Sequence, residues 1–217
     1  MLWIKGRRIL VISMFCLLTG SMVYADEQPS RMREDKTHIQ IWNQFVTDIL
    51  TLHEQMIVAQ DIGKTSKPGG YASQPDFYIE EEYRDAQGRL LSRLQWERET
   101  PANLHAIELY IYDQRGRIIR DYAGAYLPNY RNAPTQTLLS LHNYSDQLHA
   151  FRTFDASADF LFERCSGRYL GKEVFISLDI DEKEALEGRT NTVMTSKAYA
   201  ACFKGLAQTA GNFLQPQ

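Results

Sequence analysis

The chain of 217 residues carries 24 basic and 27 acidic side chains, which give a formal net charge of −3. Apolar residues make up 44%, aromatic residues 12% and charged residues 24% of the sequence. This composition excludes a disordered chain, a collagen-like repeat and a multi-span membrane protein. Because basic residues are not in excess, the sequence also argues against a nucleic-acid partner, whose phosphates bind Lys and Arg.

The first 25 residues have the features of a secretory signal peptide. Three basic residues lie at positions 5–8, an apolar stretch follows over 9–18, and small residues at positions 23 and 25 match a signal-peptidase site. The alternative is an uncleaved membrane anchor, but its apolar segment is short against the ~20 residues of a spanning helix. We therefore expect cleavage after Ala25, no stable membrane span after cleavage, and a periplasmic or secreted protein.

The mature chain would keep 192 of the 217 residues and would carry a formal charge of −6, since the leader holds three basic residues and no acidic one. A chain of this length can bury one sizeable core. We expect a polar, flexible lead-in over 26–36 and a single domain over 37–217.

Two cysteines remain after cleavage, Cys165 and Cys202, which are 37 positions apart. In an oxidising compartment an even pair indicates a disulfide bond. The alternative is a catalytic Cys165 thiolate with His142 or His149 as its base. Since no cysteine-protease signature surrounds Cys165, the sequence favours the disulfide.

A helix is predicted from Thr37 to a point near Gly63. Thr37 and Gln40 have the spacing of a capping box, and apolar residues over 41–57 recur at steps of three and four. The segment 64–70 holds two glycines, two lysines and a proline, so we expect a loop there.

Antiparallel strands are predicted after this loop, because apolar and polar residues alternate between turn sequences. The seven predicted segments are 77–83, 89–97, 104–112, 117–122, 148–154, 160–165 and 173–180. A last helix, capped by Thr195 or Ser196, is expected to continue to Phe213. The predicted fold class is α+β: an antiparallel β-meander of about seven strands packed by an N-terminal and a C-terminal helix.

Two of the predicted turns share the motif Asp-x-x-Gly-Arg, at 85–89 and 113–117, and a degenerate copy follows at 155–158. The glycine supplies the positive φ that a short turn requires. The motif resembles the tyrosine-aspartate repeats of large secreted toxins, but a solenoid needs about three or more copies. We therefore interpret it as hairpin chemistry.

No sequence motif indicates catalysis or a cofactor. The five histidines lack metal-ligand spacings, and there is no P-loop, dinucleotide motif or nucleophile elbow. We expect no metal, no cofactor and a core position for His53. Glu81 is predicted to face the helix beside Ile79, where burial would raise its pKa and suit it to acid catalysis. The alternative is a glutamate paired with Arg93.

The segment 120–137 is predicted to be a long connection with unusual aromatic content. Tyr122, Tyr126, Tyr130 and Arg131 are residue types that anchor recognition surfaces, so we predict a partner-binding loop. The alternative is that its tyrosines fold back over the end of the sheet.

These observations predict an exported, soluble, non-enzymatic binding or accessory protein of the cell envelope, with an envelope protein as its partner. An alternative is a periplasmic carrier of an apolar small molecule, because the predicted strands are rich in aromatic residues. A further alternative is a carboxylate-dependent envelope hydrolase that uses Glu81.

Overall fold

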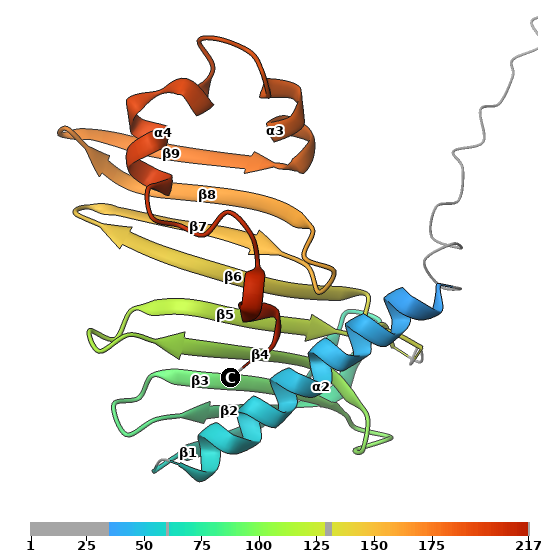
Figure 1. Ribbon diagram of the computed structural model, residues 1–217. Helices are drawn as coiled ribbons and strands as arrows, with labels where there is room; N and C mark the ends of the chain where they lie inside the picture. Colours follow the sequence, from blue (N-terminus) through green and yellow to red (C-terminus); the bar gives the residue numbers. More distant parts are fainter. Residues whose placement is uncertain (1–34, 60, 129–131, 217) are drawn as a thin grey trace, which may run out of the picture.

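The computed structural model describes residues 35–59, 61–128 and 132–216 (Figure 1). The predicted signal peptide, nearly all of the lead-in, Tyr130 and Arg131 lie outside the described residues. Within the described part, no helix is both long and apolar enough to cross a membrane.

The chain forms one antiparallel sheet of nine strands in sequence order, with three α-helices among the described residues. The helices are α2 (Lys36–Val58), α3 (Ile180–Leu186) and α4 (Lys197–Phe203), and short 3-10 turns are η1 (Val193–Thr195) and η2 (Gly211–Leu214). The strands are β1 (Gly63–Tyr71), β2 (Gln74–Arg84), β3 (Leu90–Glu97), β4 (Leu104–Tyr112), β5 (Ile118–Ala125), β6 (Gln136–Ser145), β7 (Leu148–Phe154), β8 (Phe160–Tyr169) and β9 (Lys172–Asp179). The predicted antiparallel meander is confirmed.

The predicted number of about seven strands is wrong, because β1 and β6 are also strands. β1 contains Pro68, which suits an edge strand that pairs on one side only. The connection predicted over 120–137 is shorter, since β5 continues to Ala125 and β6 begins at Gln136. The sequence prediction ended this strand too early because Gly124 is not a typical strand residue. A Cβ at Gly124 would lie 2.5 Å from a Val46 methyl group, so helix packing requires this glycine.

α2 and α4 lie on the same face of the sheet, in front of the strands in Figure 1, and α3 follows the end of β9 at the top edge. Gly124 of β5 lies against Val46 of α2, Cys165 of β8 bonds to Cys202 of α4, and these strand residues share one face through the pairing register. The buried residues of α2 are Trp42, Phe45, Val46, Ile49, Leu52 and His53. The opposite face, which we call the open face, carries none of the described helices.

The helix predicted from residue 196 to 213 is much shorter than expected. Ser196 caps α4 as predicted, accepting a hydrogen bond from Tyr199 N, but the helix ends at Phe203. The backbone leaves the helix at Lys204, which is extended, and Gly205 follows with a φ of +79°, so the chain turns away into the C-terminal tail. The predicted disulfide is confirmed: Cys165 and Cys202 are bonded, with a Cα–Cα distance of 5.9 Å.

The two Asp-x-x-Gly-Arg motifs form hairpin turns of the same construction, as predicted. Asp113 Oδ1 accepts hydrogen bonds from the backbone N–H groups of Arg115 and Arg117, at 2.8 and 2.9 Å. Its Oδ2 accepts from Arg117 Nε at 2.8 Å, and Gly116 has a φ of +75°. Asp85 makes the equivalent contacts in the β2–β3 turn.

Candidate functional site

A cavity opens where β5 and β6 separate. Their pairing ends at Arg120 and Leu141, although β5 begins at Ile118 and β6 continues to Ser145. The cavity of about 270 Å³ lies between these diverging strand ends and the C-terminal tail. Four lining residues come from the strands (Ile119, Arg120, Leu141 and His142) and four from the tail (Gly205, Leu206, Ala207 and Phe213). We call it the β5–β6 cavity.

The C-terminal tail, which is the segment that follows α4, covers this cavity. Side chains of three neighbouring strands hold it in place. Asn143 Nδ2 donates to Lys204 O at 2.9 Å, and Arg152 Nη1 donates to Ala207 O at 2.6 Å. The Tyr122 hydroxyl donates to Phe213 O at 2.9 Å. Figure 1 shows the tail descending from α4 across the middle strands. The roof is therefore tied to the sheet through the carbonyl groups of the tail.

Arg120 is the charged group of the cavity. Its guanidinium lies 5.5 Å from the ring centre of Tyr122 and 4.9 Å from that of Phe213. Its Nε is buried without a hydrogen-bond partner, and among the described ion pairs Arg120 has no carboxylate partner. A cation held between two rings beside apolar walls suits an anionic group that also carries apolar surface.

A chain of hydrogen bonds leads across the open face to the same strand ends. His142 Nε2 lies 2.5 Å from Asp121 Oδ2, and His142 Nδ1 lies 2.9 Å from His149 Nε2. If His142 Nε2–H donates to the Asp121 carboxylate, His142 Nδ1 accepts from His149 Nε2–H. The two contacts use opposite nitrogens of His142, so the three side chains do not converge on one ion. In the described ranges, no three His, Cys, Asp or Glu side chains form a metal site.

His149 is held by stacked rings. Its imidazole is parallel to the Tyr144 ring at 4.4 Å between centres, and the Arg117 guanidinium lies 4.6 Å from the centre of the Tyr144 ring. Burial, with a smaller contribution from His142, lowers the pKa of His149. The His149 imidazole is therefore largely neutral at pH 7 and able to donate to His142.

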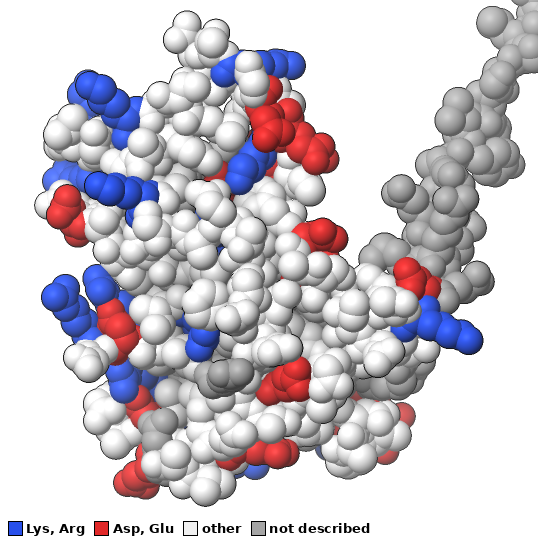
Figure 2. Space-filling view, in the orientation of Figure 1, with Lys and Arg blue, Asp and Glu red and all other residues white. Residues whose placement is uncertain are grey.

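The surface around the cavity is basic at the same end of the sheet. Figure 2 shows that many Lys and Arg atoms of the helix-covered face gather along the margin where, in Figure 1, the β4–β5 and β8–β9 turns lie. Arg115 and Lys204 are exposed cations of this end. Such charges favour the approach of an anion.

The structure does not bring the predicted partner-binding residues together on an exposed loop. Tyr122 lies in β5 with 1% of its surface exposed, and its hydroxyl holds the tail through Phe213 O, so a partner-binding role for Tyr122 stays a prediction. Tyr126 is half-buried and its hydroxyl donates to Asn43 Oδ1 at 3.0 Å. A partner-binding role for Tyr126 stays a prediction.

Glu81 faces the helix-covered side as predicted, but its predicted raised pKa is wrong. Its carboxylate pairs with Lys64 at 2.6 Å and accepts from the Tyr83 hydroxyl at 2.8 Å. Burial opposes ionisation, but these partners outweigh it, and the pKa of Glu81 is lowered. An ionised glutamate is unsuited to acid catalysis. His53 is the predicted core histidine, bonded through Nδ1 to Ser92 Oγ at 2.8 Å.

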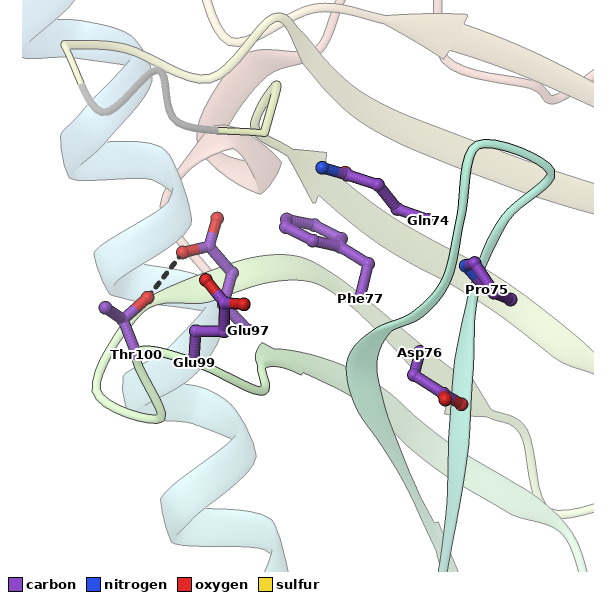
Figure 3. A pocket seen from close by; sticks show the side chains of 7 residues that line it. All are labelled: Gln74, Pro75, Asp76, Phe77, Glu97, Glu99 and Thr100. Atoms are coloured by element: carbon purple, nitrogen blue, oxygen red, sulfur yellow. Dashed lines mark hydrogen bonds between the residues drawn. The ribbon is translucent and has the colours of Figure 1, made fainter.

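A second cavity, of about 340 Å³, lies at the other end of β2 and β3 (Figure 3). Its carboxylates hold the β3–β4 loop: Glu97 accepts from the Thr100 hydroxyl at 2.7 Å and from Asn103 Nδ2 at 3.1 Å. Asp76 pairs with Arg98 at 3.5 Å. Because these contacts have a structural purpose, the β5–β6 cavity is the stronger candidate for a ligand.

Comparison with family models, curated proteins and solved structures found no match to this chain. The function is therefore argued from the site alone. The sequence placed Arg120 at the start of the aromatic segment 120–137, but it revealed neither the position of Arg120 in a cavity nor the contact between His142 and His149. The seven-residue spacing of these histidines makes them diagonal neighbours only once β6 and β7 are known to form a hairpin.

Proposed function

We propose that this chain is an exported, non-enzymatic binding protein of the cell envelope that holds a small apolar carboxylate in the β5–β6 cavity. The observation that supports this most is Arg120, a cation between two aromatic rings in a largely apolar cavity. The proposal joins two of the roles expected from the sequence, a binding protein and a carrier of an apolar small molecule.

The chemistry of the cavity favours a carboxylate with an apolar body. The guanidinium group offers parallel N–H donors that match the two oxygens of a carboxylate. Leu141, Leu206 and Phe213 supply apolar surface beside it. The volume of about 270 Å³ lies just below that of typical small-molecule sites, which start at about 300 Å³. A short aliphatic or aromatic acid therefore suits the cavity better than a long-chain lipid.

An exported location suits this role. The Cys165–Cys202 bond is typical of oxidising compartments such as the periplasm or the extracellular space. The predicted signal peptide supports the same location. Intact mass of the protein purified from the native envelope fraction tests cleavage after Ala25.

The direct test is calorimetric titration of the mature protein with octanoate and phenylacetate, and with octanol as a neutral analogue. Wild type should bind an acid and bind octanol more weakly. Arg120→Met keeps the length of the side chain and removes its charge, so affinity for the acid should fall at least about tenfold, since hydrogen bonds to charged groups contribute about 1.5–3 kcal/mol. Arg115→Met, an exposed position in the β4–β5 turn, is the matched control and should bind as wild type does.

Equal binding by wild type and Arg120→Met would refute the assignment of Arg120, and equal affinity for octanol and octanoate would refute the carboxylate. Mass spectrometry of a solvent extract from protein purified from its native envelope adds an independent readout. An acid recovered from wild type and missing from Arg120→Met supports the proposal.

The accessory role with an envelope protein partner rests on the aromatic segment that the sequence singled out. An affinity pull-down from the native envelope fraction, with Tyr126→Phe as a control for Tyr126→Ala, tests it. Because Tyr126 bonds to Asn43, both variants require a thermal melt to show that they are folded. A partner retained equally by wild type and Tyr126→Ala would contradict the role of this residue.

A further inference from the structure

The two edges of the nine-stranded sheet differ in chemistry. β1 carries Lys64, Lys67 and Pro68, and its pairing is irregular between Gly69 and Tyr71. Lysine, proline and irregular pairing are features that prevent a strand from joining another sheet. β9, the outermost strand at the top of Figure 1, has no proline and no irregularity in its pairing with β8. β9 carries one lysine, Lys172, at its end beside the turn, so proline and irregular pairing protect only the β1 edge.

The orientation of the β9 backbone follows from its turn. Leu170 and Gly171 connect β8 to β9, and both have positive φ values, 52° and 79°. This is the geometry of a two-residue hairpin turn. Tyr169 and Lys172 flank it as a pair, and the flanking pair exchanges both of its backbone hydrogen bonds. Bonded and non-bonded pairs then alternate along the ladder.

The backbone groups of Glu173, Phe175 and Ser177 therefore point away from β8, toward the free edge. Among the described residues, no backbone hydrogen bond joins these groups to another segment. Their side chains share the open face, all three are exposed, and Phe175 is 72% exposed. An exposed Phe at the centre of an unprotected edge strand is the arrangement that strand pairing buries.

We infer that β9 pairs antiparallel with β9 of a second copy of this chain, on a two-fold axis through Phe175. The axis must pass through a residue whose backbone points outward, which leaves Glu173, Phe175 and Ser177. An axis at Glu173 places two glutamates directly opposite each other, and like charges in that position are destabilising. An axis at Ser177 places Glu173 opposite Asp181 of α3, again with like charges.

An axis at Phe175 places no like charges directly opposite each other. Glu173 then lies opposite Ser177 of the second copy, Lys172 opposite Leu178, and the two Phe175 rings face each other as an aromatic cross-strand pair. Three pairs each exchange two backbone hydrogen bonds, so about six new bonds form along the edge. This self-complementarity favours a second copy over an unrelated extended peptide, and a symmetric pair of strands forms a closed, isologous dimer.

Sedimentation velocity of the mature, disulfide-bonded chain over a dilution series tests the inference. Wild type should change from dimer to monomer on dilution. Phe175→Lys should raise the dissociation constant at least about tenfold, because two lysines would face each other. Ser177→Pro should also weaken the dimer, since it removes an outward N–H that the monomer does not use. Val58→Lys, at an 86% exposed apolar position in α2, is the matched control and should dimerise as wild type does.

A cysteine variant tests the position of the axis. Directly opposed residues of a bonded pair have Cα atoms about 5.5 Å apart, within the range that a disulfide spans. Phe175→Cys should therefore give a disulfide-linked dimer under mild oxidation, and Val58→Cys should not. A wild type that stays monomeric at its highest soluble concentration would overturn the inference. The α3–α4 segment reaches past β9 in Figure 1, and this result would mean that it blocks the edge. A dimer unaffected by Phe175→Lys and Ser177→Pro would overturn the inference as well.

Discussion

Replacing Glu163 by glutamine should strongly destabilise the protein, because it breaks a fully buried ion pair. Arg152 and Glu163 face each other on β7 and β8, with 1% and 0% of their side chains exposed. Arg152 Nε and Nη2 both donate to Glu163 Oε2, at 2.8 and 2.5 Å. The Tyr199 hydroxyl of α4 donates to Glu163 Oε1 at 2.5 Å. The carboxylate therefore joins two strands to the last helix.

The expected loss of unfolding free energy in Glu163→Gln is about 3 kcal/mol. Removing one partner of a buried pair costs about 3–5 kcal/mol, because the remaining charge stays buried without compensation. The amide keeps an oxygen that can still accept hydrogen bonds, which places the expected value at the lower end. A domain of this size has a net stability of about 5–15 kcal/mol, so the change should be plain in a urea titration that compares midpoints at an unchanged slope.

A matched control and a double variant separate the ion pair from other effects. Asp76→Asn breaks the exposed pair with Arg98, whose side chains are 66% and 55% exposed, and should change stability by less than about 1 kcal/mol. Glu163→Leu with Arg152→Leu removes both charges and should be less damaging than Glu163→Gln, apart from the lost contacts of Arg152 with Ala207 O and of Glu163 with the Tyr199 hydroxyl and Lys183 Nζ. A Glu163→Gln protein as stable as Asp76→Asn would refute the reasoning, as would a double variant much less stable than the single one.

Three further predictions concern the cross-link and the turns. Cys165→Ala with Cys202→Ala opens a loop of 37 residues and should lower the free energy of unfolding by about 4 kcal/mol in urea titrations. Ala158 has a φ of +72° in the degenerate turn, so Ala158→Gly should raise the thermal midpoint, through a stabilisation of about 1 kcal/mol. The backbone N–H of Arg117 and its guanidinium lower the pKa of Asp113, so its carboxylate stabilises the fold above the ordinary pKa and stops doing so as the pH falls through the lowered value. The urea midpoints of wild type and Asp113→Asn should therefore differ above about pH 4 and converge in stronger acid.

Local signals in the sequence predicted the features that depend on neighbouring residues. The Asp-x-x-Gly-Arg turns, the alternation of the long strands and the amphipathic pattern of α2 each depend on contacts within a few positions. The disulfide followed from the two cysteines that remain after the predicted cleavage. The errors fall where a distant contact overrides the local signal: helix packing requires Gly124, and the position at the edge tolerates Pro68.

The candidate site depends on features that no local pattern encodes. The β5–β6 cavity exists because two strands stop pairing at Arg120 and Leu141. Its roof exists because α4 ends at Phe203 and the following tail is tied back by Asn143, Arg152 and other side chains far away in the sequence. A longer last helix, as the apolar spacing suggested, would have left no tail to cover these strands.

The two copies of the turn motif make the β3–β4 pair and the β5–β6 pair directly comparable. Both strand pairs stop pairing at a comparable distance from the turn, at Ser92 and Leu109 in one case and at Arg120 and Leu141 in the other. In both, the last arginine of the motif reaches a tyrosine near the end of the next even-numbered strand: Arg89 lies 5.1 Å from the Tyr112 ring centre, and Arg117 lies 4.6 Å from that of Tyr144.

The tyrosines at the two strand ends have different hydrogen-bond and stacking partners. The Tyr112 hydroxyl donates to Leu90 O at 2.8 Å and so closes the gap between β3 and β4. Tyr144 instead stacks on His149, and the neighbouring Asn143 side chain bonds to Lys204 O in the tail. The side chains that could bridge β5 and β6 therefore have other partners: Tyr144 contacts His149 on the open face, and Asn143 contacts the tail on the helix-covered face. The gap remains open between them, with Arg120 at its wall, which is why the same turn chemistry gives a closed sheet at one place and a cavity at the other.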